Sequence, residues 1–315
     1  MAQPELQPGV KIVFLIRNKK TFGYIVTLTA AACWGTSALF VKLVLTSVEI
    51  SPLSLAFWRD LFTFAAMLII LMIKQGSAFL KVRSGDLIWL VCLGAFGVGI
   101  FHIFWNLGIK LNGAAVATVQ QSAMTVILAV AAWFLWKEPL NARKVAAVFL
   151  TFTGTVLISG MVRNRDTSLS VTGLVVGFCI PIFYASFSIF GKQLAGRYHF
   201  LTILTYGFGF GALALSPFQF FISHPRPVPE IGWLWFLSLI VFSTIIPFSL
   251  YTHALKLLDA SIAGILIMIE IPFAFFFAYL FLGERLSLLQ FGGAILITTG
   301  VLLVSCFEKS RTMGA

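Results

Sequence analysis

The sequence predicts an all-α integral membrane protein with ten transmembrane helices, which form two inverted five-helix repeats. Three observations lead to this prediction. Hydrophobic residues make up 59% of the 315 residues and charged residues only 10%, whereas charged residues make up about a quarter of a typical soluble domain. The hydrophobic residues also gather in blocks long enough to cross a bilayer. Finally, the later blocks repeat residues of the earlier ones.

The length of the apolar blocks indicates membrane-spanning helices. Lys20 to Lys42 encloses 21 residues without a charge, and Lys110 to Lys137 encloses 26, while a bilayer core needs roughly 20. Helices are expected because unpaired backbone groups are costly in lipid and the blocks lack the alternation of barrel strands. The predicted spans are 22–44, 53–73, 86–109, 113–136, 143–161, 171–191, 200–221, 231–253, 260–282 and 287–307.

The breaks between these blocks divide the chain into two repeats and two short tails. We expect an N-terminal tail at 1–21, a first repeat at 22–161, a second repeat at 171–307 and a C-terminal tail at 308–315. The basic residues Arg17, Lys19 and Lys20 precede the first block, as in a signal peptide. That block is too long for a signal peptide, so it is interpreted as an uncleaved first helix.

The distribution of basic residues predicts the orientation. If the N-terminus is cytoplasmic, fifteen Lys and Arg residues fall on the inner side and six on the outer side. Cytoplasmic connections carry such an excess, and an even number of spans returns the C-terminus to the same side. We therefore predict a multi-pass protein of the cytoplasmic (inner) membrane with both termini in the cytoplasm. The net charge of +11 is interpreted as this topology signal, and no nucleic acid is expected as a partner.

The second half of the chain repeats the first. At a shift of 146 residues, identical residues coincide at Lys110 and Lys256, Ala114 and Ala260, Glu138 and Glu284, and Gly154 and Gly300. At a shift of 150, Trp34 coincides with Tyr184 and Lys42 with Lys192. Because each half holds an odd number of spans, the halves would have opposite orientations. Inverted repeats are typical of carriers, which bind substrate near the midplane between the repeats.

The repeated stretches resemble the two copies of an EamA domain, which belongs to the drug/metabolite transporter superfamily. The similarity rests on Ala260-Ser-Ile-Ala-Gly, Leu282-Gly-Glu-Arg-Leu, and the matching stretch from Ala114 through Glu138-Pro-Leu. Trp34-Gly35 and Ala56-Phe-Trp-Arg also fit. The resemblance implies a ten-helix carrier with cytoplasmic termini, often an exporter of amino acids, nucleosides, drugs or related metabolites. One departure is Ile271, which separates Glu270 from Pro272.

Two charged positions inside spans are candidates for substrate binding, because such charges are kept only toward an interior or a partner. Arg59 is either an anion clamp or half of a pair between helices, and its neighbour Asp60 should have a different partner. Glu270, near the middle of a span, is either a proton carrier or ammonium partner, or a structural strut. Pro272 cannot donate to the Met268 carbonyl, which we expect to be left exposed at that depth.

Polar and aromatic residues in other spans complete the predicted site. His102, Trp105 and Asn106 share a helix face, and their pattern recurs at Tyr251. At least one of the neighbouring Gln120 and Gln121 should face the cavity. The aromatic pair related by the repeat, Trp34 and Tyr184, would supply gates, or else pack in the core.

The predicted function is a secondary transporter that moves a small metabolite across the membrane by alternating access. The expected cargo is an amino acid or a similar amphipathic compound, the expected direction is export, and protons are a candidate coupling ion. The alternatives are an ion or solute channel and a non-transporting membrane protein. No enzyme, metal or cofactor is predicted. The glycine-rich stretches 94–99 and 207–211 lack nucleotide-binding spacing, so we expect them to serve close helix packing.

Overall fold

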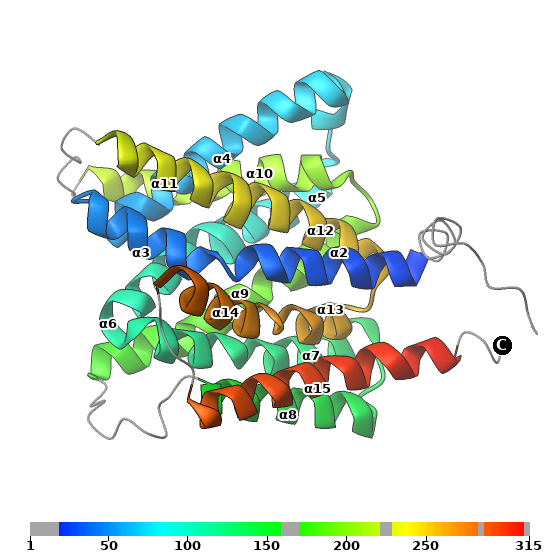
Figure 1. Ribbon diagram of the computed structural model, residues 1–315. Coiled ribbons are helices and arrows are strands. Elements are labelled where there is room, and N and C mark those ends of the chain that lie inside the picture. The colour runs from blue at the N-terminus through cyan, green and yellow to red at the C-terminus, as the bar shows by residue number, and fades with distance from the viewer. Residues whose placement is uncertain (1–18, 159–169, 221–228, 283–286, 312–315) are drawn as a thin grey trace, which may run out of the picture.

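The computed structural model describes residues 19–158, 170–220, 229–282 and 287–311. All regular elements in these ranges are helices, and most lie side by side along one direction (Figure 1). In the first half they are α2 (Lys19–Trp34), α3 (Ser37–Ser47), α4 (Pro52–Lys74), the 3₁₀ turn η1 (Ser77–Leu80), α5 (Ser84–Cys92), the π-helical η2 (Leu93–Ile100), α6 (Phe101–Ser122), α7 (Met124–Trp136) and α8 (Ala142–Ile158).

The second half contains a similar series. Its helices are α9 (Val171–Ala195), α10 (Phe200–Gln219), α11 (Glu230–Ile240), the π-helical η3 (Val241–Ile245), α12 (Ile246–Leu257), α13 (Ala260–Ile267), α14 (Glu270–Leu282) and α15 (Leu288–Arg311). Helices in the two halves begin at equivalent positions. At the shift of 146 residues, the first residue of α5 corresponds to that of α11, that of α7 to that of α14, and that of α8 to that of α15.

Eight helical segments in the described part of the chain are long and apolar enough to cross a membrane. They are Lys19–Ser47, Pro52–Lys74, Ser84–Asn112, Ala117–Trp136, Val171–Ala195, Phe200–Gln219, Glu230–Leu257 and Ala260–Phe281. The predicted fifth span coincides with α8, which has 17 residues, and the predicted tenth with the shorter apolar stretch Leu288–Val304 of α15. The chain is therefore an all-helical, multi-pass membrane protein.

The first predicted span is not one continuous helix. It consists of α2 and α3, separated by Gly35 and Thr36. A Cβ atom at Gly35 would lie 2.7 Å from Cβ of Phe273 and 3.0 Å from the backbone nitrogen of Ala274. The glycine thus allows α14 to approach the break closely. This break widens the element beyond the predicted 22–44, because α3 continues to Ser47.

The predicted connection between the third and fourth spans is helical, since α6 covers Phe101–Ser122 without interruption. Even so, Asn112 Nδ2 donates a hydrogen bond of 2.9 Å to Gln120 Oε1. Eight residues of straight helix would separate the two Cα atoms by about 12 Å, which is too far for these side chains. The chain must therefore bend sharply between Asn112 and Gln120.

Local sequence explains where several helices start and stop. The hydroxyl of Ser51 accepts a hydrogen bond from the backbone N–H of Ser54, and Pro52 occupies the first turn of α4. Ser170 caps α9 in the same way through Gly173 N–H. Both arrangements satisfy N–H groups that a helix start leaves unpaired. The chain leaves α7 through Lys137, which has a left-handed backbone with φ of 56°.

The two glycine-rich stretches pack against each other, as the sequence predicts. A Cβ at Gly94 in η2 would lie 2.5 Å from the carbonyl oxygen of Gly207 in α10. One at Gly99 would lie 2.8 Å from the carbonyl oxygen of Gly211. Real Cβ atoms do not come this close, so glycine lets the two backbones touch directly. This contact brings η2, and with it the start of α6, against α10.

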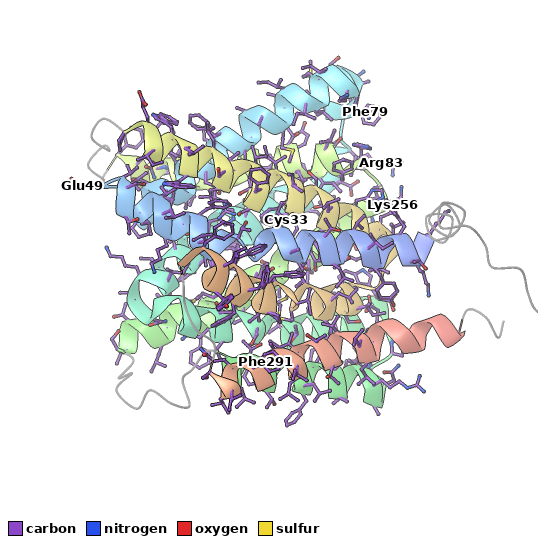
Figure 2. The ribbon with its side chains drawn as sticks, viewed as in Figure 1. Cys33, Glu49, Phe79, Arg83, Lys256 and Phe291 are labelled. Carbon is purple, nitrogen blue, oxygen red and sulfur yellow. The ribbon has the colours of Figure 1, made fainter. Side chains whose placement is uncertain are left out.

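The ends of the bundle differ in character. Helix α2 begins and α15 ends at the same end (Figure 1). Arg83 and Lys256 lie at that end, and Glu49 lies at the opposite one (Figure 2). At the basic end, buried Glu138 accepts hydrogen bonds from the first backbone N–H groups of α13, at Ala260 (2.9 Å) and Ser261 (3.2 Å). The carboxylate thus caps a helix start that is itself buried.

Candidate functional site

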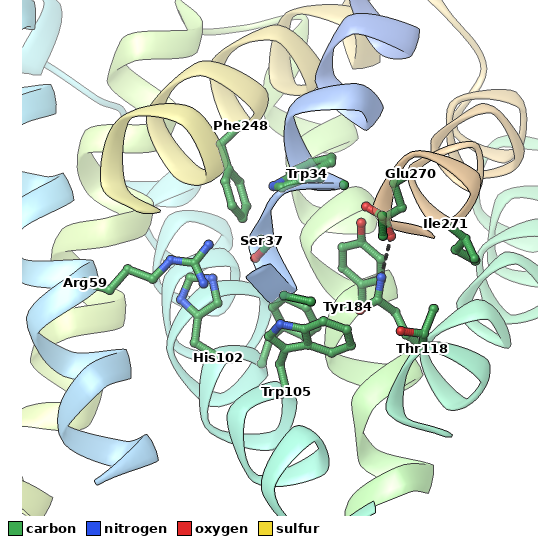
Figure 3. Close-up of a pocket in the computed structure, with 15 residues that line it drawn as sticks. Trp34, Ser37, Arg59, His102, Trp105, Thr118, Tyr184, Phe248, Glu270 and Ile271 are labelled. Carbon is green, nitrogen blue, oxygen red and sulfur yellow. Dashed lines mark hydrogen bonds between the residues drawn. The ribbon is translucent and has the colours of Figure 1, made fainter. Parts of the chain in front are cut away.

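A cavity lies inside the bundle beside the break between α2 and α3, and residues from both halves of the chain line it (Figure 3). It holds about 540 Å³ of space not filled by atoms, part of it continuous with the surroundings. Small-molecule sites typically measure roughly 300–1,000 Å³. The lining residues are Trp34, Gly35, Ser37, Ala38, Arg59, Phe101, His102, Trp105, Thr118, Gln121, Tyr184, Phe248, Glu270, Ile271 and Ala274.

Two interrupted helices meet at this cavity. Glu270 is the first residue of α14, directly after the interruption that follows α13, and Gln121 immediately precedes the break between α6 and α7. Gln121 Nε2 donates a hydrogen bond of 2.5 Å to Glu270 Oε1 (Figure 3). The Glu270 side chain is 7% exposed. A carboxyl group at a helix start is favoured by the helix dipole, so the break positions the acid.

The backbone at this break differs from the prediction in one respect. The Met268 carbonyl, which Pro272 cannot pair, accepts a hydrogen bond of 3.1 Å from the Ile271 N–H. The expectation of an exposed acceptor was therefore wrong. A tighter three-residue turn satisfies the carbonyl, which is a common way to end a helix.

Arg59 and Asp60 have different partners, as their adjacent positions on one helix predict. Arg59 Nε donates to the Thr244 hydroxyl at 2.8 Å, and its Nη2 donates to the Ser243 carbonyl at 3.3 Å. Both acceptors belong to the π-helical η3, whose widened turn occurs often at functional sites. Asp60 Oδ1 instead lies 2.6 Å from His102 Nδ1. Arg59 lines the cavity and links the two halves of the chain as well.

Aromatic side chains form one wall of the cavity. The Trp34 ring meets Phe248 edge to face, with centroids 4.9 Å apart, and lies 6.4 Å from the Tyr184 ring. Tyr184 in turn stacks on Phe101 at 4.8 Å. The repeat-related pair of Trp34 and Tyr184 thus comes together, and Tyr184 and Glu270 point toward the same part of the cavity (Figure 3).

Seven of the ten predicted site residues line this cavity, namely Trp34, Arg59, His102, Trp105, Gln121, Tyr184 and Glu270. Three do not. Asn106 is fully buried and donates to the Pro52 carbonyl at 2.9 Å, so it ties α6 to the start of α4. Gln120 accepts the hydrogen bond from Asn112. Tyr251 packs behind Trp34, and its hydroxyl lies 2.9 Å from that of Ser188.

Several lining residues escaped the sequence analysis. Thr118 precedes Gln121 by three residues, so the helical period could have revealed it. Ser37 and Ala38 line the cavity only because the chain breaks before α3, and the sequence does not show that break. Phe248 is one of 33 phenylalanines, and nothing in its surroundings distinguishes it. Asp60 was noted only as a neighbour of Arg59, although it holds His102.

Another histidine lies outside the cavity, in the short connection between α9 and α10. Burial lowers the pKa of His199 below its usual value, and the nearby His253 and Lys256 lower it further. At neutral pH this imidazole is therefore mainly uncharged. It packs edge to face on Phe79, with centroids 5.7 Å apart, and adds no charge near the cavity.

Comparison with known proteins agrees with these features. The chain is 27% identical over 277 residues to a transporter of Archaeoglobus fulgidus, covering 86% of this chain and 93% of the relative. It is 25% identical to the inner membrane transporter YicL of Salmonella typhimurium, covering 93% and 98%. A solved crystal structure with 18% sequence identity superposes with a TM-score of 0.76, covering 92% of this chain and 98% of that one. It therefore has the same fold.

The model of the EamA-like transporter family matches the chain twice, at residues 21–160 and 171–306. Together the two matches cover most of the sequence and include every residue that lines the cavity. The chain belongs to the EamA-like transporter family.

Proposed function

We propose that this transporter is a secondary carrier that exports a small metabolite, such as an amino acid or a similar amphipathic compound, by alternating access. One observation carries the proposal. The cavity lies between the two segments that match the family, and its acid, Glu270 in the second segment, is held by Gln121 of the first. A site shared by two repeats can change its access when one repeat moves against the other.

We propose further that the chain crosses the membrane ten times, as two inverted repeats at about 22–161 and 171–307. The matched helix starts at a shift of 146 residues support this organisation. Packing supports it too. A Cβ at Gly154 of α8 would lie 2.6 Å from the Gly293 carbonyl, and one at Gly300 of α15 would lie 2.9 Å from the Ala147 carbonyl. These contacts are exchanged by the same shift, as a two-fold axis between α8 and α15 requires.

The orientation of the proposed carrier follows from its charges. The excess of basic residues favours a cytoplasmic location for both termini, and the shared end of α2 and α15 fits this arrangement (Figure 1). The relatives YicL and YhbE are named as inner membrane transporters, which supports placement in the cytoplasmic membrane. Under this orientation, the capped start of α13 lies on the cytoplasmic side.

The proposed substrate contacts fit a small compound with opposite charges. Glu270 offers a partner for an ammonium group, and the guanidinium of Arg59 offers one for a carboxylate. Trp34, Trp105 and Tyr184 supply apolar surface with polar edges between them. The other proposed contacts are His102 and Gln121, with Asn106, Gln120 and Tyr251 behind the cavity wall.

Energy for export would come from a gradient, with protons as the candidate coupling ion, because the sequence has no Walker-type nucleotide motif. The experiment is efflux from proteoliposomes loaded with a panel of radiolabelled metabolites that includes the twenty amino acids, with and without a pH gradient. We expect saturable efflux of at least one compound. Electrical current without saturation would indicate a channel, and no movement of any compound above protein-free liposomes would contradict the carrier.

A further inference from the structure

Two buried polar atoms beside the cavity have no hydrogen-bond partner among the described residues. They are Nε2 of His102 and Oδ2 of Asp60. The His102 side chain is 1% exposed and that of Asp60 is fully buried. Buried polar atoms are nearly always paired in folded proteins, so each unpaired atom requires an explanation. His102 lines the cavity, which makes a bound substrate a natural partner for its ring.

The contact at the other ring nitrogen determines what Nε2 can offer. Nδ1 of His102 lies 2.6 Å from Oδ1 of Asp60. An ionised carboxylate only accepts hydrogen bonds, so Nδ1 must carry the hydrogen that it donates. In the neutral imidazole, Nε2 is then left with a lone pair and acts as an acceptor. Arg59, the preceding residue on α4, places a fixed positive charge close to this carboxylate.

Packing holds the pair in this geometry. The His102 ring stacks on Phe208, with centroids 6.4 Å apart, and meets Phe248 edge to face at 6.1 Å. Behind Asp60, a Cβ at Gly211 would lie 3.2 Å from Oδ2. The glycine therefore leaves the room that the carboxylate occupies. Neither side chain can turn to another partner without displacing these neighbours.

We propose that Asp60 is a positioning residue of the transport site, which holds His102 so that Nε2 presents a hydrogen-bond acceptor to the substrate. The site then takes compounds that place a donor, a hydroxyl or a protonated amine, at this point. This inference rests on the proposed function and specifies its substrate further. The charged groups that line the same cavity are Arg59 and Glu270, so a cationic donor can bind between His102 and Glu270.

Nitrogen NMR of His102 tests the inference without a substrate. Replacing His199, His224 and His253 with glutamine leaves one histidine in the chain, which is labelled with ¹⁵N and measured at neutral pH in lipid bilayers. We expect the neutral tautomer with hydrogen on Nδ1 and none on Nε2. Hydrogen on Nε2, in a neutral ring or in an imidazolium, would overturn the proposal. This spectrum decides the matter even if variants of Asp60 fail to fold.

The Asp60→Asn variant adds a readout that a structural role would not change. Its side-chain amide can donate to Nδ1, which moves the ring hydrogen to Nε2 and reverses the polarity toward the cavity. We expect that tautomer change, together with an apparent KM at least tenfold higher for efflux of a radiolabelled mixture of the twenty amino acids. Asp60→Glu, which keeps the carboxylate, should retain the wild-type tautomer. A wild-type KM in Asp60→Asn would overturn the inference, whereas an inactive wild type would count against the proposed function instead.

Discussion

At the scale of single residues, the cavity combines an acid, a base and aromatic rings that lie far apart in the sequence. Glu270 and Gln121 meet across the two halves, and each lies next to a helix interruption. Arg59 is anchored on η3 by Thr244. A charged group inside the membrane is retained only where it has a partner or a function. The hydrogen bond from Gln121 satisfies one Glu270 oxygen and leaves the carboxyl group accessible from the cavity.

Replacing Glu270 with glutamine tests its role in transport. Glutamine keeps the shape and a hydrogen-bonding oxygen but cannot titrate or carry charge. We expect transport to fall about tenfold or more, which corresponds to roughly 1.4 kcal/mol in the barrier, while the thermal unfolding temperature in detergent stays near that of the wild type.

The matched control is Glu230→Gln, because Glu230 is exposed and begins α11 away from the cavity. It should leave both transport and stability unchanged. Wild-type kinetics of Glu270→Gln at every pH would exclude a role in binding or proton exchange. A large loss of thermal stability would identify Glu270 as a structural strut.

Glu138 illustrates a buried charge with a structural task. It accepts the first N–H groups of α13, and Nζ of Lys144 lies 3.7 Å from its Oε2. Glu138→Ala removes the acceptor for these groups and one of the carboxylates beside Lys144. Leaving buried donors unpaired costs about 1–3 kcal/mol each, so the unfolding temperature should drop markedly. A variant as stable as the wild type in a fluorescence melt would show that the cap is dispensable.

The sequence predicted much of the site and missed what depends on tertiary contacts. Charge in an apolar span singled out Arg59 and Glu270, and helical period grouped His102 with Trp105. The period alone could not decide between Gln120 and Gln121, since neighbouring helical residues point about 100° apart. Likewise, Asn106 shares the face of His102 but finds its partner in the Pro52 carbonyl. Such choices depend on which helix packs alongside.

At the scale of helices, glycine determines how closely neighbours approach. Helices α8 and α15 touch through Gly154 and Gly300, where added Cβ atoms would lie 2.6 Å and 2.9 Å from carbonyl oxygens of the partner helix. In lipid, helix association depends on such close packing because the hydrophobic effect contributes little. The glycine contacts therefore determine the spacing of this pair.

Gly154→Ala should force α8 and α15 apart and lower stability by about 1–3 kcal/mol, as overpacking does. The control lies in the same pair of helices. Gly292 in α15 has nothing within 4 Å of an added Cβ, so Gly292→Ala should be neutral, or stabilise by up to about 1 kcal/mol through helix propensity. Thermal unfolding in detergent measures both variants, and equal effects would show that the glycine contact is not what holds the pair.

Helix positions were more predictable than helix interruptions. Each predicted span coincides with described helices, because apolar length and capping residues such as Ser51 and Ser170 are visible in the sequence. The break at Gly35, the interruption before Glu270 and the π-helical η2 and η3 were not predicted. They arise where side chains from other helices, such as Phe273 at Gly35, compete with regular backbone hydrogen bonding.

At the scale of the whole molecule, the proposed ten-span topology places the connections at 162–170 and 222–230 outside the cell. Single cysteines at Ser168 and Ser223, in a background without the four native cysteines, should react with a membrane-impermeant maleimide in intact cells. A cysteine between 75 and 83 should react only after lysis. The opposite pattern would reverse the orientation, and labelling of only one outer site would change the number of crossings.

The central claim is that the cavity between the two halves carries a small metabolite through alternating access. Counterflow measures this most directly. Proteoliposomes are loaded with an unlabelled compound that the efflux panel identifies, and uptake of the radiolabelled compound is followed against equal external and internal concentrations of coupling ion. A carrier whose site faces one side at a time predicts uptake that is faster and transiently higher with internal compound than without it, and lost in Glu270→Gln. Uptake that internal compound does not accelerate, with the same rate in Glu270→Gln, would contradict the account.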